Sequence, residues 1–293
     1  MSMKKYLSLI KFSHTIFAMP FACVGFGLGV TDQWGSFQYV DLSNWIWKGL
    51  GVVACMVFAR SAAMAFNRYL DRNIDAMNPR TSMREIPAGL ISPKRALAFT
   101  MINSILFVAA AGLINPLCFL LSPVALLVVL GYSYTKRFTA LCHLILGIGL
   151  SLSVIGAYLA VTGSFSLMPI IFSFVVLTWV SGFDILYAMQ DESFDRTQAL
   201  HSVPAWIGGR RALLVSSALH FLTIAALFLA GIWGDLGLWY WMGVLIFTGL
   251  LIYQHALVSA DDLSRIDLAF MTTNGIGSVV FALFFLAELI FTY

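Results

Sequence analysis

Long apolar runs alternate with short polar segments along the whole chain. Each run has about 20 residues, the length that a helix needs to cross the roughly 30 Å hydrocarbon core of a bilayer. No A-x-A-like cleavage site follows the first run, so we expect it to be a retained helix rather than a signal peptide. The pattern predicts an all-α polytopic membrane protein with nine transmembrane helices. The nine runs cover 14–31, 46–66, 95–114, 116–133, 141–162, 168–189, 211–232, 236–258 and 268–290.

Composition agrees with this pattern and excludes other classes of protein. The 293 residues are 60% hydrophobic and 11% charged, whereas soluble domains are about 25% charged. Such a chain is not a disordered segment, a collagen, a disulfide-stapled secreted domain or a cytosolic enzyme. The cysteines show no pairing pattern, and we interpret them as reduced packing residues. They are Cys23, Cys55, Cys118 and Cys142.

The few charges indicate how the chain is oriented in the membrane. Lys and Arg number 17 against 14 Asp and Glu, and this balance gives no electrostatic basis for a nucleic-acid partner. If the N-terminus is cytoplasmic, nearly all basic residues fall on the cytoplasmic side, as the positive-inside rule requires. We therefore expect an integral protein of the bacterial inner (plasma) membrane, with its N-terminus and the two long polar loops, 67–94 and 190–210, in the cytoplasm. The cytoplasmic basic residues are Lys4, Lys5, Lys11, Arg68, Arg72, Arg80, Arg84, Lys94, Arg95, Lys136, Arg137, Arg196, Arg210, Arg211 and Arg265.

The two long polar loops resemble each other. Each carries Asp-x3-Asp, then Arg-Thr, then Pro-Ala, then a basic pair followed by Ala-Leu, in the same order. The offset between the copies corresponds to four spans, which preserves membrane orientation. We therefore expect a single transmembrane domain over 1–293 that contains two parallel four-helix repeats and a ninth helix. The repeats cover about 1–140 and 141–265, and the ninth helix covers 268–290.

Two polar motifs with i, i+4, i+8 spacing lie where spans meet these loops. On a helix each motif forms one stripe. Four carboxylates that face one another need a cation, and Mg²⁺ takes carboxylate oxygens together with substrate phosphates. Basic residues around the same place would complete a clamp for a diphosphate. The motifs are Asn67-x3-Asp71-x3-Asp75 and Tyr187-x3-Asp191-x3-Asp195.

Two further charges lie inside predicted spans. Arg60 lies seven residues before Asn67, and Asp184 lies seven residues before Asp191. A charge in a span costs about 2.5–3.5 kcal/mol on insertion scales, so it usually pairs or contacts substrate. Arg60 is therefore expected to bind either a structural partner such as Asp184 or a carboxylate of the substrate. Asp184 and Tyr187 continue the second stripe, and we include both among the candidate substrate-binding residues.

These motifs resemble the UbiA superfamily of intramembrane aromatic prenyltransferases, and so do the nine-span layout and the Tyr132-x3-Lys136-Arg137 element. The segments 11–22, 64–89 and 182–196 are similar to the 4-hydroxybenzoate polyprenyltransferase-like branch. That branch includes relatives that act in the futalosine route to menaquinone. Arg68 departs from the pattern, because many relatives place a third acid directly after the asparagine.

The resemblance implies a reaction and a set of roles. A polyprenyl diphosphate would ionise with Mg²⁺, and its allylic cation would attack the ring of an aromatic carboxylic acid, 4-hydroxybenzoate or a dihydroxynaphthoate, in ubiquinone or menaquinone biosynthesis. Arg60 would bind the ring carboxylate, and the prenyl tail would enter from membrane lipid. Mg²⁺ would be held by Asp71, Asp75, Asp191 and Asp195, aided by Asn67. The diphosphate would be contacted by Arg72, Arg80, Arg84, Tyr132, Lys136 and Arg196.

A secondary transporter is the alternative function. Parallel repeats and intramembrane charges fit that class as well. The acidic residues, however, cluster toward one face of the membrane rather than at its midplane. Only an enzyme of the proposed kind would release pyrophosphate from a prenyl diphosphate in the presence of Mg²⁺.

Overall fold

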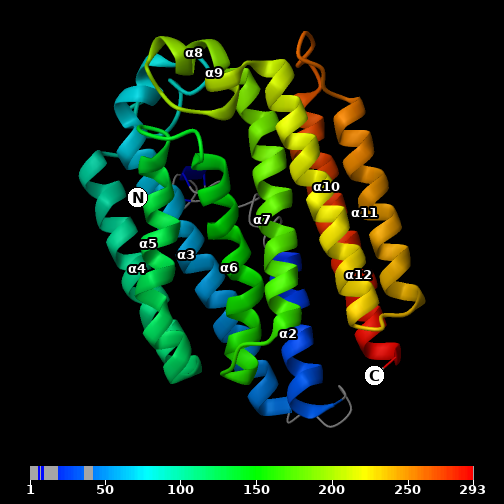
Figure 1. Ribbon diagram of the computed structural model, residues 1–293. Helices are drawn as coiled ribbons and strands as arrows, with labels where there is room; N and C mark the ends of the chain where they lie inside the picture. Colours follow the sequence, from blue (N-terminus) through cyan, green and yellow to red (C-terminus); the bar gives the residue numbers. More distant parts are fainter. Residues whose placement is uncertain (1–5, 7, 10–18, 36–41, 293) are drawn as a thin grey trace.

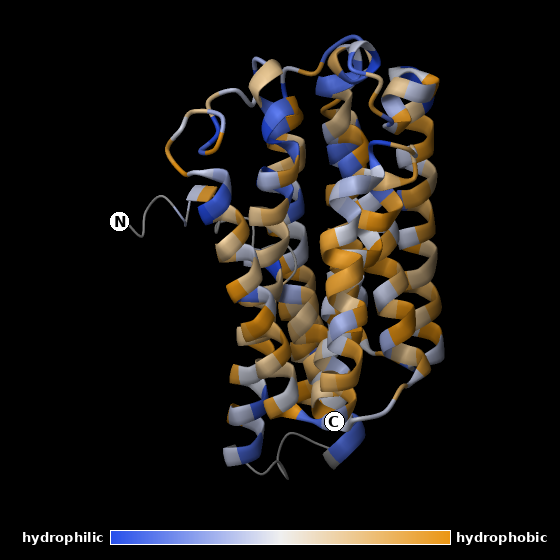
Figure 2. Ribbon diagram, turned by 90° about the vertical axis from the view of Figure 1, so that its left-hand side faces the viewer, coloured by the Kyte–Doolittle hydropathy of each residue, from blue (hydrophilic) through white to orange (hydrophobic). Residues whose placement is uncertain are grey.

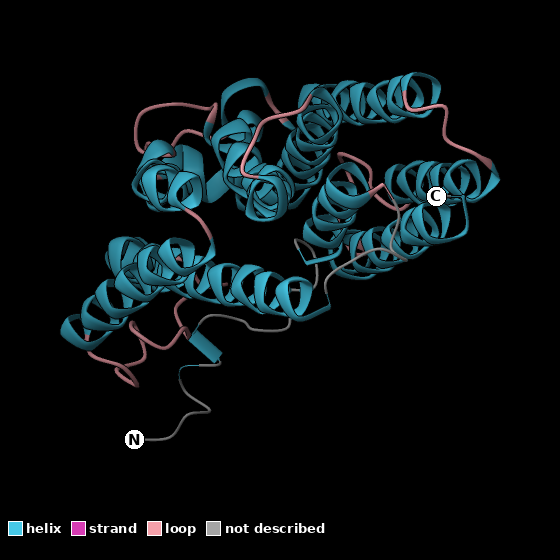
Figure 3. Ribbon diagram, turned by 90° about the horizontal axis from the view of Figure 1, so that it is seen from below, coloured by secondary structure: helices cyan, strands magenta, loops and turns pink. Residues whose placement is uncertain are grey.

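The computed structural model describes residues 6, 8–9, 19–35 and 42–292. Helices run through this part of the chain, and it contains no strand (Figure 3). The elements are α2 (Met19–Trp34), α3 (Leu42–Met77), α4 (Pro93–Ile114), α5 (Pro116–Thr135), α6 (Cys142–Thr162), α7 (Leu167–Ala188), η3 (Met189–Asp191), α8 (Glu192–Thr197), α9 (Val203–Ile207), α10 (Gly209–Trp233), α11 (Leu238–Ala256), η4 (Leu268–Thr273) and α12 (Asn274–Thr292).

Every predicted span overlaps a helix of the structure, and the all-α membrane fold is confirmed. Within the described ranges, seven helices are long and apolar enough to cross a membrane. The count of nine spans and the repeat layout stay predictions. Residues 14–18 of the first predicted span lie outside the described residues, as do Lys4, Lys5 and Lys11. The seven helices are Ser43–Met77, Pro93–Ile114, Pro116–Thr135, Cys142–Thr162, Leu167–Thr197, Gly209–Trp233 and Leu268–Thr292.

Helix α3 is much longer than the apolar run that predicted it. Its 36 residues would extend over about 54 Å, well beyond the roughly 30 Å of a hydrocarbon core. The additional turns contain Asn67, Asp71 and Asp75. The first polar motif therefore lies on a regular helix that continues out of the apolar zone, as its spacing predicted.

The connection between α4 and α5 depends on a single asparagine. Asn115 ends α4, and its side-chain oxygen accepts a hydrogen bond from the Cys118 amide at 2.8 Å, which caps α5. Pro116 occupies the first turn of α5, where its missing N–H leaves no unpaired donor. The Asn115 side-chain nitrogen also donates to the Leu159 carbonyl of α6 at 2.8 Å. This turn therefore ties three helices together.

The helices form one bundle whose two sides differ in packing. Helix α6 contacts α2, α5 and α7, and the chain continues around the other side through α10, α11 and α12, which returns to α2 (Figure 1). That second side holds the main aromatic core, which links α2 and α7 to α11 and α12. The largest buried side chains of this core are Phe21, Phe172, Trp179, Tyr240, Phe247, Phe281 and Phe285.

Glycines allow the closest helix contacts. A Cβ atom on Gly25 of α2 would lie 2.1 Å from the Val154 carbonyl oxygen of α6. A Cβ atom on Gly147 of α6 would lie 2.4 Å from the Ser181 hydroxyl of α7. Both contacts require a residue without a side chain, so these glycines allow close helix packing.

We expect Gly147→Ala to lower the stability of the bundle by about 1–3 kcal/mol, because the added methyl forces α6 and α7 apart. The matched control is Gly156→Ala on the same helix, where no described atom lies within 4 Å of the added carbon. Thermal unfolding of the purified proteins in detergent compares them. Equal melting temperatures for the two variants would contradict the packing role.

Candidate functional site

The polar residues that the sequence selected gather at one end of the bundle. Helices α8 and α9 mark this end at the top of Figure 1. Hydrophilic residues concentrate at the two ends of the molecule, while hydrophobic residues cover most of its length (Figure 2). The site therefore lies where the apolar zone meets the polar end.

Asp71 is a buried carboxylate that two cations of the turn directly after α5 neutralise. Its side chain is 2% exposed and lies 2.8 Å from Lys136 Nζ and 3.0 Å from Arg137 Nη2. The Asn67 side-chain nitrogen also donates to Asp71 at 3.2 Å. Asn67 further contacts the Ser133 hydroxyl at 3.5 Å. The Tyr132-x3-Lys136 element thus lies directly against the first acidic motif.

Asp75, one turn further along α3, has one paired oxygen and one unpaired oxygen. Arg84 donates to Oδ1 at 2.7 Å. Oδ2 is buried and has no hydrogen-bond partner. A buried carboxylate oxygen without a partner is costly. This oxygen is therefore the feature of the site that best fits a bound cation.

Asp191 of the second motif binds residues that follow the first motif. The Arg80 guanidinium forms a two-pronged ion pair with this carboxylate, and the Asn78 side chain donates to it at 3.1 Å. Arg80 also donates to the Tyr187 hydroxyl at 3.3 Å and lies over the Tyr187 ring. Partial burial alone would lower the pKa of Arg80, but its hydrogen bonds to Asp191 and the charge of Asp191 raise that pKa above its ordinary value. The two motifs are thus connected through the loop after α3.

The second motif does not continue as one regular helix, contrary to its spacing. Tyr187 lies in the last turn of α7, Asp191 closes a 3-10 turn, and Asp195 lies on the short α8. Tightening into a 3-10 turn is common at helix ends. Ser202 donates to the Asp195 carboxylate at 2.8 Å, so Asp195 binds the segment between α8 and α9.

A histidine that the sequence left without a role anchors that segment. The Val203 amide donates to His143 Nε2 at 3.2 Å, so the other ring nitrogen, Nδ1, carries the proton and donates to Asp184 at 2.7 Å. Nearby, the His201 amide donates to the Lys136 carbonyl at 2.6 Å. Asp184, predicted to bind substrate, thus holds a histidine that fixes the loop beside the second motif.

Two of the predicted diphosphate contacts lie elsewhere in the structure. Arg72 donates to the Tyr69 carbonyl at 2.6 Å and lies over the Tyr69 ring. Arg196 pairs with Glu192 at 3.0 Å and donates to the Ala205 carbonyl. Each arginine is one residue after an aspartate of its motif, so on a helix it faces a different direction.

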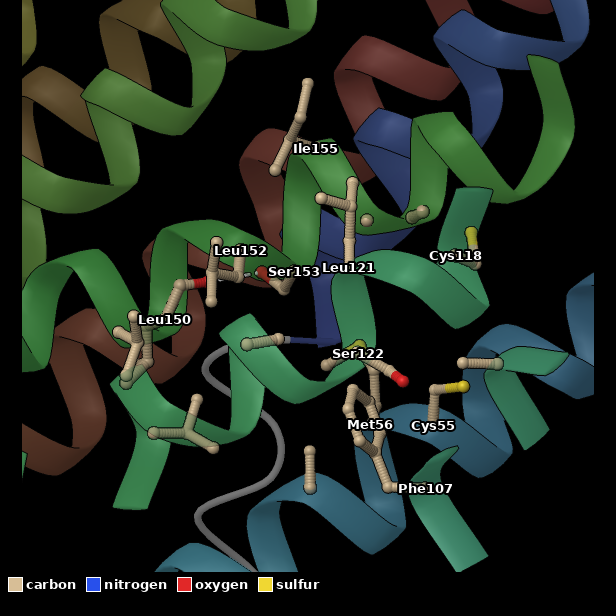
Figure 4. A pocket seen from close by; sticks show the side chains of 18 of the residues that line it. Cys55, Met56, Phe107, Cys118, Leu121, Ser122, Leu150, Leu152, Ser153 and Ile155 are labelled. Atoms are coloured by element: carbon tan, nitrogen blue, oxygen red, sulfur yellow. Dashed lines mark hydrogen bonds between the residues drawn. The ribbon is translucent and has the colours of Figure 1, made fainter. Parts of the chain in front are cut away.

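An apolar cavity of about 410 Å³ lies in the bundle between α3, α4, α5 and α6, and its lining on α3 ends at Met64, three residues before Asn67. Arg60 and Tyr132 line it together with aliphatic side chains, and Figure 4 shows Cys55, Phe107 and Ser122 around it. The lining on α3 extends from Val52 to Met64, about 18 Å along the helix axis. The cavity can therefore take an extended apolar chain.

Arg60 has no protein partner at its Nε, which is buried, and no described residue forms a hydrogen bond or ion pair with it. The sequence left open a structural pairing of Arg60 with Asp184. The structure pairs Asp184 with His143 instead. The guanidinium of Arg60 is thus available to an anionic ligand.

The donor set at this end is suited to a hard divalent cation, although it is not assembled around one. Carboxylate and amide oxygens are the ligands that Mg²⁺ prefers. In the part of the chain that the structure describes, no three His, Cys, Asp or Glu side chains are grouped to hold a metal ion. Arg and Lys side chains bind Asp71, Asp75 and Asp191. The unpaired oxygen of Asp75 is nevertheless consistent with a cation in this site.

Most of the charged residues of the candidate site were predicted from the sequence. The neutral residues that bind its carboxylates were not. Asn78, Ser202 and His143 hold Asp191, Asp195 and Asp184. Asn78 directly precedes Pro79, and Ser202 is the N-cap of the short α9. Those local signals predict turns and caps, and nothing in them indicates which carboxylate the side chain reaches.

Comparison with known proteins gives consistent results. The sequence model of the UbiA prenyltransferase family matches residues 18–286. The 4-hydroxybenzoate octaprenyltransferase of Aeromonas hydrophila is 31% identical over 85% of this chain and 86% of its own length. The enzyme of the same name from Nitrosomonas europaea is 33% identical over 77% of each chain.

Solved structures have the same architecture. The apo structure of a UbiA homologue from Aeropyrum pernix K1 is 30% identical and superposes with a TM-score of 0.78 over 95% of this chain and 98% of its own. A UbiA homologue from Archaeoglobus fulgidus, bound to DMAPP and Mg²⁺, has a TM-score of 0.74 at 21% identity, covering 99% and 100% of the two chains. The second similarity concerns the fold alone.

We expect His143→Ala to loosen the segment between α8 and α9, because the Val203 amide and the Asp184 carboxylate lose their shared partner. Amide exchange at residues 198–207 should accelerate, by an amount equivalent to about 1–3 kcal/mol of local stability. His201→Ala is the control, since its exposed side chain forms no hydrogen bond that the structure shows and only its backbone amide and carbonyl are used. Unchanged exchange in His143→Ala would disprove the anchoring role.

Proposed function

The chain belongs to the UbiA prenyltransferase family, and we propose that it transfers a polyprenyl group from polyprenyl diphosphate to the ring of an aromatic carboxylic acid, 4-hydroxybenzoate or a dihydroxynaphthoate, in quinone biosynthesis. One observation carries this proposal beyond the family. Two acidic motifs on separate helices are joined through Asn78 and Arg80 near an apolar cavity, and the wall of this cavity holds an arginine with no partner among the described residues. Diphosphate, prenyl chain and aromatic acid each have a chemically suitable place in this arrangement.

The diphosphate would lie between the acidic motifs, where cations of the protein already gather. Arg80, Arg84 and Lys136 each reach a carboxylate of the motifs within ion-pair distance. On substrate binding these side chains can turn from the carboxylates to the diphosphate oxygens, which are stronger acceptors for bidentate and charge-assisted bonds. Held in this way, the leaving pyrophosphate is stabilised as its negative charge develops.

Asp71, Asp75, Asp191 and Asp195, with Asn67, would hold Mg²⁺ against the diphosphate. Bound there, the ion neutralises charge on the leaving group and acts as a Lewis acid. The unpaired Asp75 oxygen supports a cation at this position. Because Arg80 and Lys136 bind the same carboxylates, metal and diphosphate are expected to bind together rather than separately.

The prenyl chain would occupy the apolar cavity. Its wall is almost entirely aliphatic and aromatic, so it excludes water from the allylic cation that forms when the diphosphate leaves. Aromatic side chains such as Phe107 and Tyr132 line the same space, and aromatic faces stabilise cations. We propose that the chain enters the cavity from membrane lipid.

Arg60 would bind the carboxylate of the aromatic acceptor. It lies on α3 about 10 Å below Asn67, as estimated from the helical rise, and lines the cavity together with Tyr132. An acceptor held there has its ring near the carbon that the diphosphate leaves. Pairing with a substrate carboxylate would compensate a charge that otherwise has no partner in an apolar wall.

We also propose a cellular location and a domain organisation for the chain. The chain is an integral membrane protein, and we propose that it resides in a bacterial inner membrane with the site facing the cytoplasm, since most basic residues lie at that end. We further propose one transmembrane domain over 1–293, built from two parallel repeats and a ninth helix. Its active site would combine carboxylates from both repeats.

Membranes containing the protein, supplied with Mg²⁺, a prenyl diphosphate and either 4-hydroxybenzoate or a dihydroxynaphthoate, should form a ring-prenylated acid and release pyrophosphate. Mass spectrometry identifies the product and the preferred acceptor. Removal of divalent cations with EDTA should stop both signals, and added Mg²⁺ should restore them. A transporter would give neither signal under any of these conditions.

Asp71→Ala and Asp191→Ala should each lower turnover at least 10²-fold, because each removes one of the charges that would hold the metal diphosphate. Pyrophosphate release in membranes measures this effect. Asp261→Ala is the control, since Asp261 is exposed and pairs only with Arg210. Retained activity in both site variants would contradict the assignment.

Arg60→Ala should raise the KM for the aromatic acid about 10–100-fold, which corresponds to the loss of one charge-assisted hydrogen-bonded pair. The KM for the prenyl diphosphate should change much less. Steady-state kinetics with each substrate varied in turn separates the two effects. An unchanged KM for the acceptor would remove Arg60 from this role.

A further inference from the structure

Arg68 is a charged side chain enclosed by protein, and no group in the described part of the chain pairs with it. It follows Asn67 directly and is 4% exposed. Its Nε is buried without a hydrogen-bond partner, and within the described residues no hydrogen bond or ion pair reaches its guanidinium. Lys and Arg are almost never fully buried unless they are paired. An enclosed guanidinium without a counter-charge is among the most costly arrangements in a protein.

The surroundings of Arg68 explain why no described side chain forms an ion pair with its guanidinium. The groups near enough to act on it electrostatically are Arg84, Asp75, Glu85 and Tyr132. The Asp75 carboxylate pairs with Arg84 at 2.7 Å, and Glu85 accepts a hydrogen bond from Ser8 at 2.5 Å. Asp75 Oδ1 and Glu85 thus bind other groups, the second oxygen of Asp75 is unpaired, and Arg84 adds a second positive charge nearby.

Arg68 is positioned toward the candidate site. It lies seven residues before Asp75, so the two side chains share one line along α3, two turns apart. It also acts on Tyr132, which lines the cavity and is itself within electrostatic range of Arg60 and Asp71. Arg60 and Arg68, both unpaired at Nε, are thus both within electrostatic range of the same phenol.

We propose that Arg68 binds an anionic oxygen group of a substrate in the site beside Tyr132. This inference rests on the proposed function and adds a residue that the motif comparison treated only as a departure. Two groups have the required chemistry. A diphosphate with its metal would compensate both Arg68 and the unpaired oxygen of Asp75, whereas the carboxylate of the aromatic acid would compensate Arg68 alone.

The test measures stability and binding on the purified full-length chain. Arg68→Met removes the charge and keeps the length of the side chain, and Arg95→Met is the control because Arg95 is exposed on α4. Without ligand, Arg68→Met should melt at the same temperature as the wild type or higher, since a binding residue without a protein partner costs stability. A Tm clearly below that of the wild type and the control, or failure to fold, would reveal a structural role and overturn the inference.

Binding of geranyl diphosphate with Mg²⁺ and of 4-hydroxybenzoate is then measured separately by ligand-induced shifts in Tm. Arg68→Met should bind one of the two at least tenfold more weakly, and Arg95→Met should match the wild type. Weaker binding of geranyl diphosphate would identify the diphosphate as the group that Arg68 binds. Weaker binding of 4-hydroxybenzoate would identify the carboxylate of the aromatic acid instead. Wild-type affinity of Arg68→Met for both compounds would overturn the inference alone. A wild type that bound neither compound would overturn the proposed function together with it.

Discussion

The site is organised by the requirement that an enclosed charge needs a counter-charge. At the polar end of the bundle, Asp71, Asp75 and Asp191 each bind a cation, and the cations come from other segments of the chain. The Arg80–Asp191 pair matters most, because it joins the loop after α3 to the end of α7. These pairs thus bring together two motifs that are more than a hundred residues apart in sequence.

The same requirement identifies the charged groups of the candidate site that lack a full set of partners. Arg60, Arg68 and one oxygen of Asp75 are buried without partners, and all three belong to the long helix α3. Unpaired groups of both signs along one helix match a ligand that carries both signs, such as a diphosphate with its metal and a carboxylic acid beside it. A bound ligand of this kind would relieve the cost of these unpaired groups.

The two sides of the bundle differ in what they enclose. The side that contains α7, α10, α11 and α12 packs a dense aromatic core around Trp179 and Phe281. The side that contains α3, α4, α5 and α6 instead encloses the apolar cavity. Close glycine contacts at Gly25 and Gly147 bind α6 to α2 and α7. Helix α6, which lines the cavity, is thereby packed closely against the side that contains the aromatic core.

The sequence by itself determined the membrane class, the position of the helices and most of the site. Apolar run length is set by bilayer thickness, and i, i+4 spacing places Asn67, Asp71 and Asp75 on one stripe whatever the neighbours are. Which groups bind the charged side chains of the site was decided by the tertiary structure alone. Nothing in the sequence shows that Asp184 binds His143, that Asp191 binds Arg80 and Asn78, or that Arg68 binds no protein group. A side chain's partner depends on which distant segments pack around it, and local spacing carries no information about that.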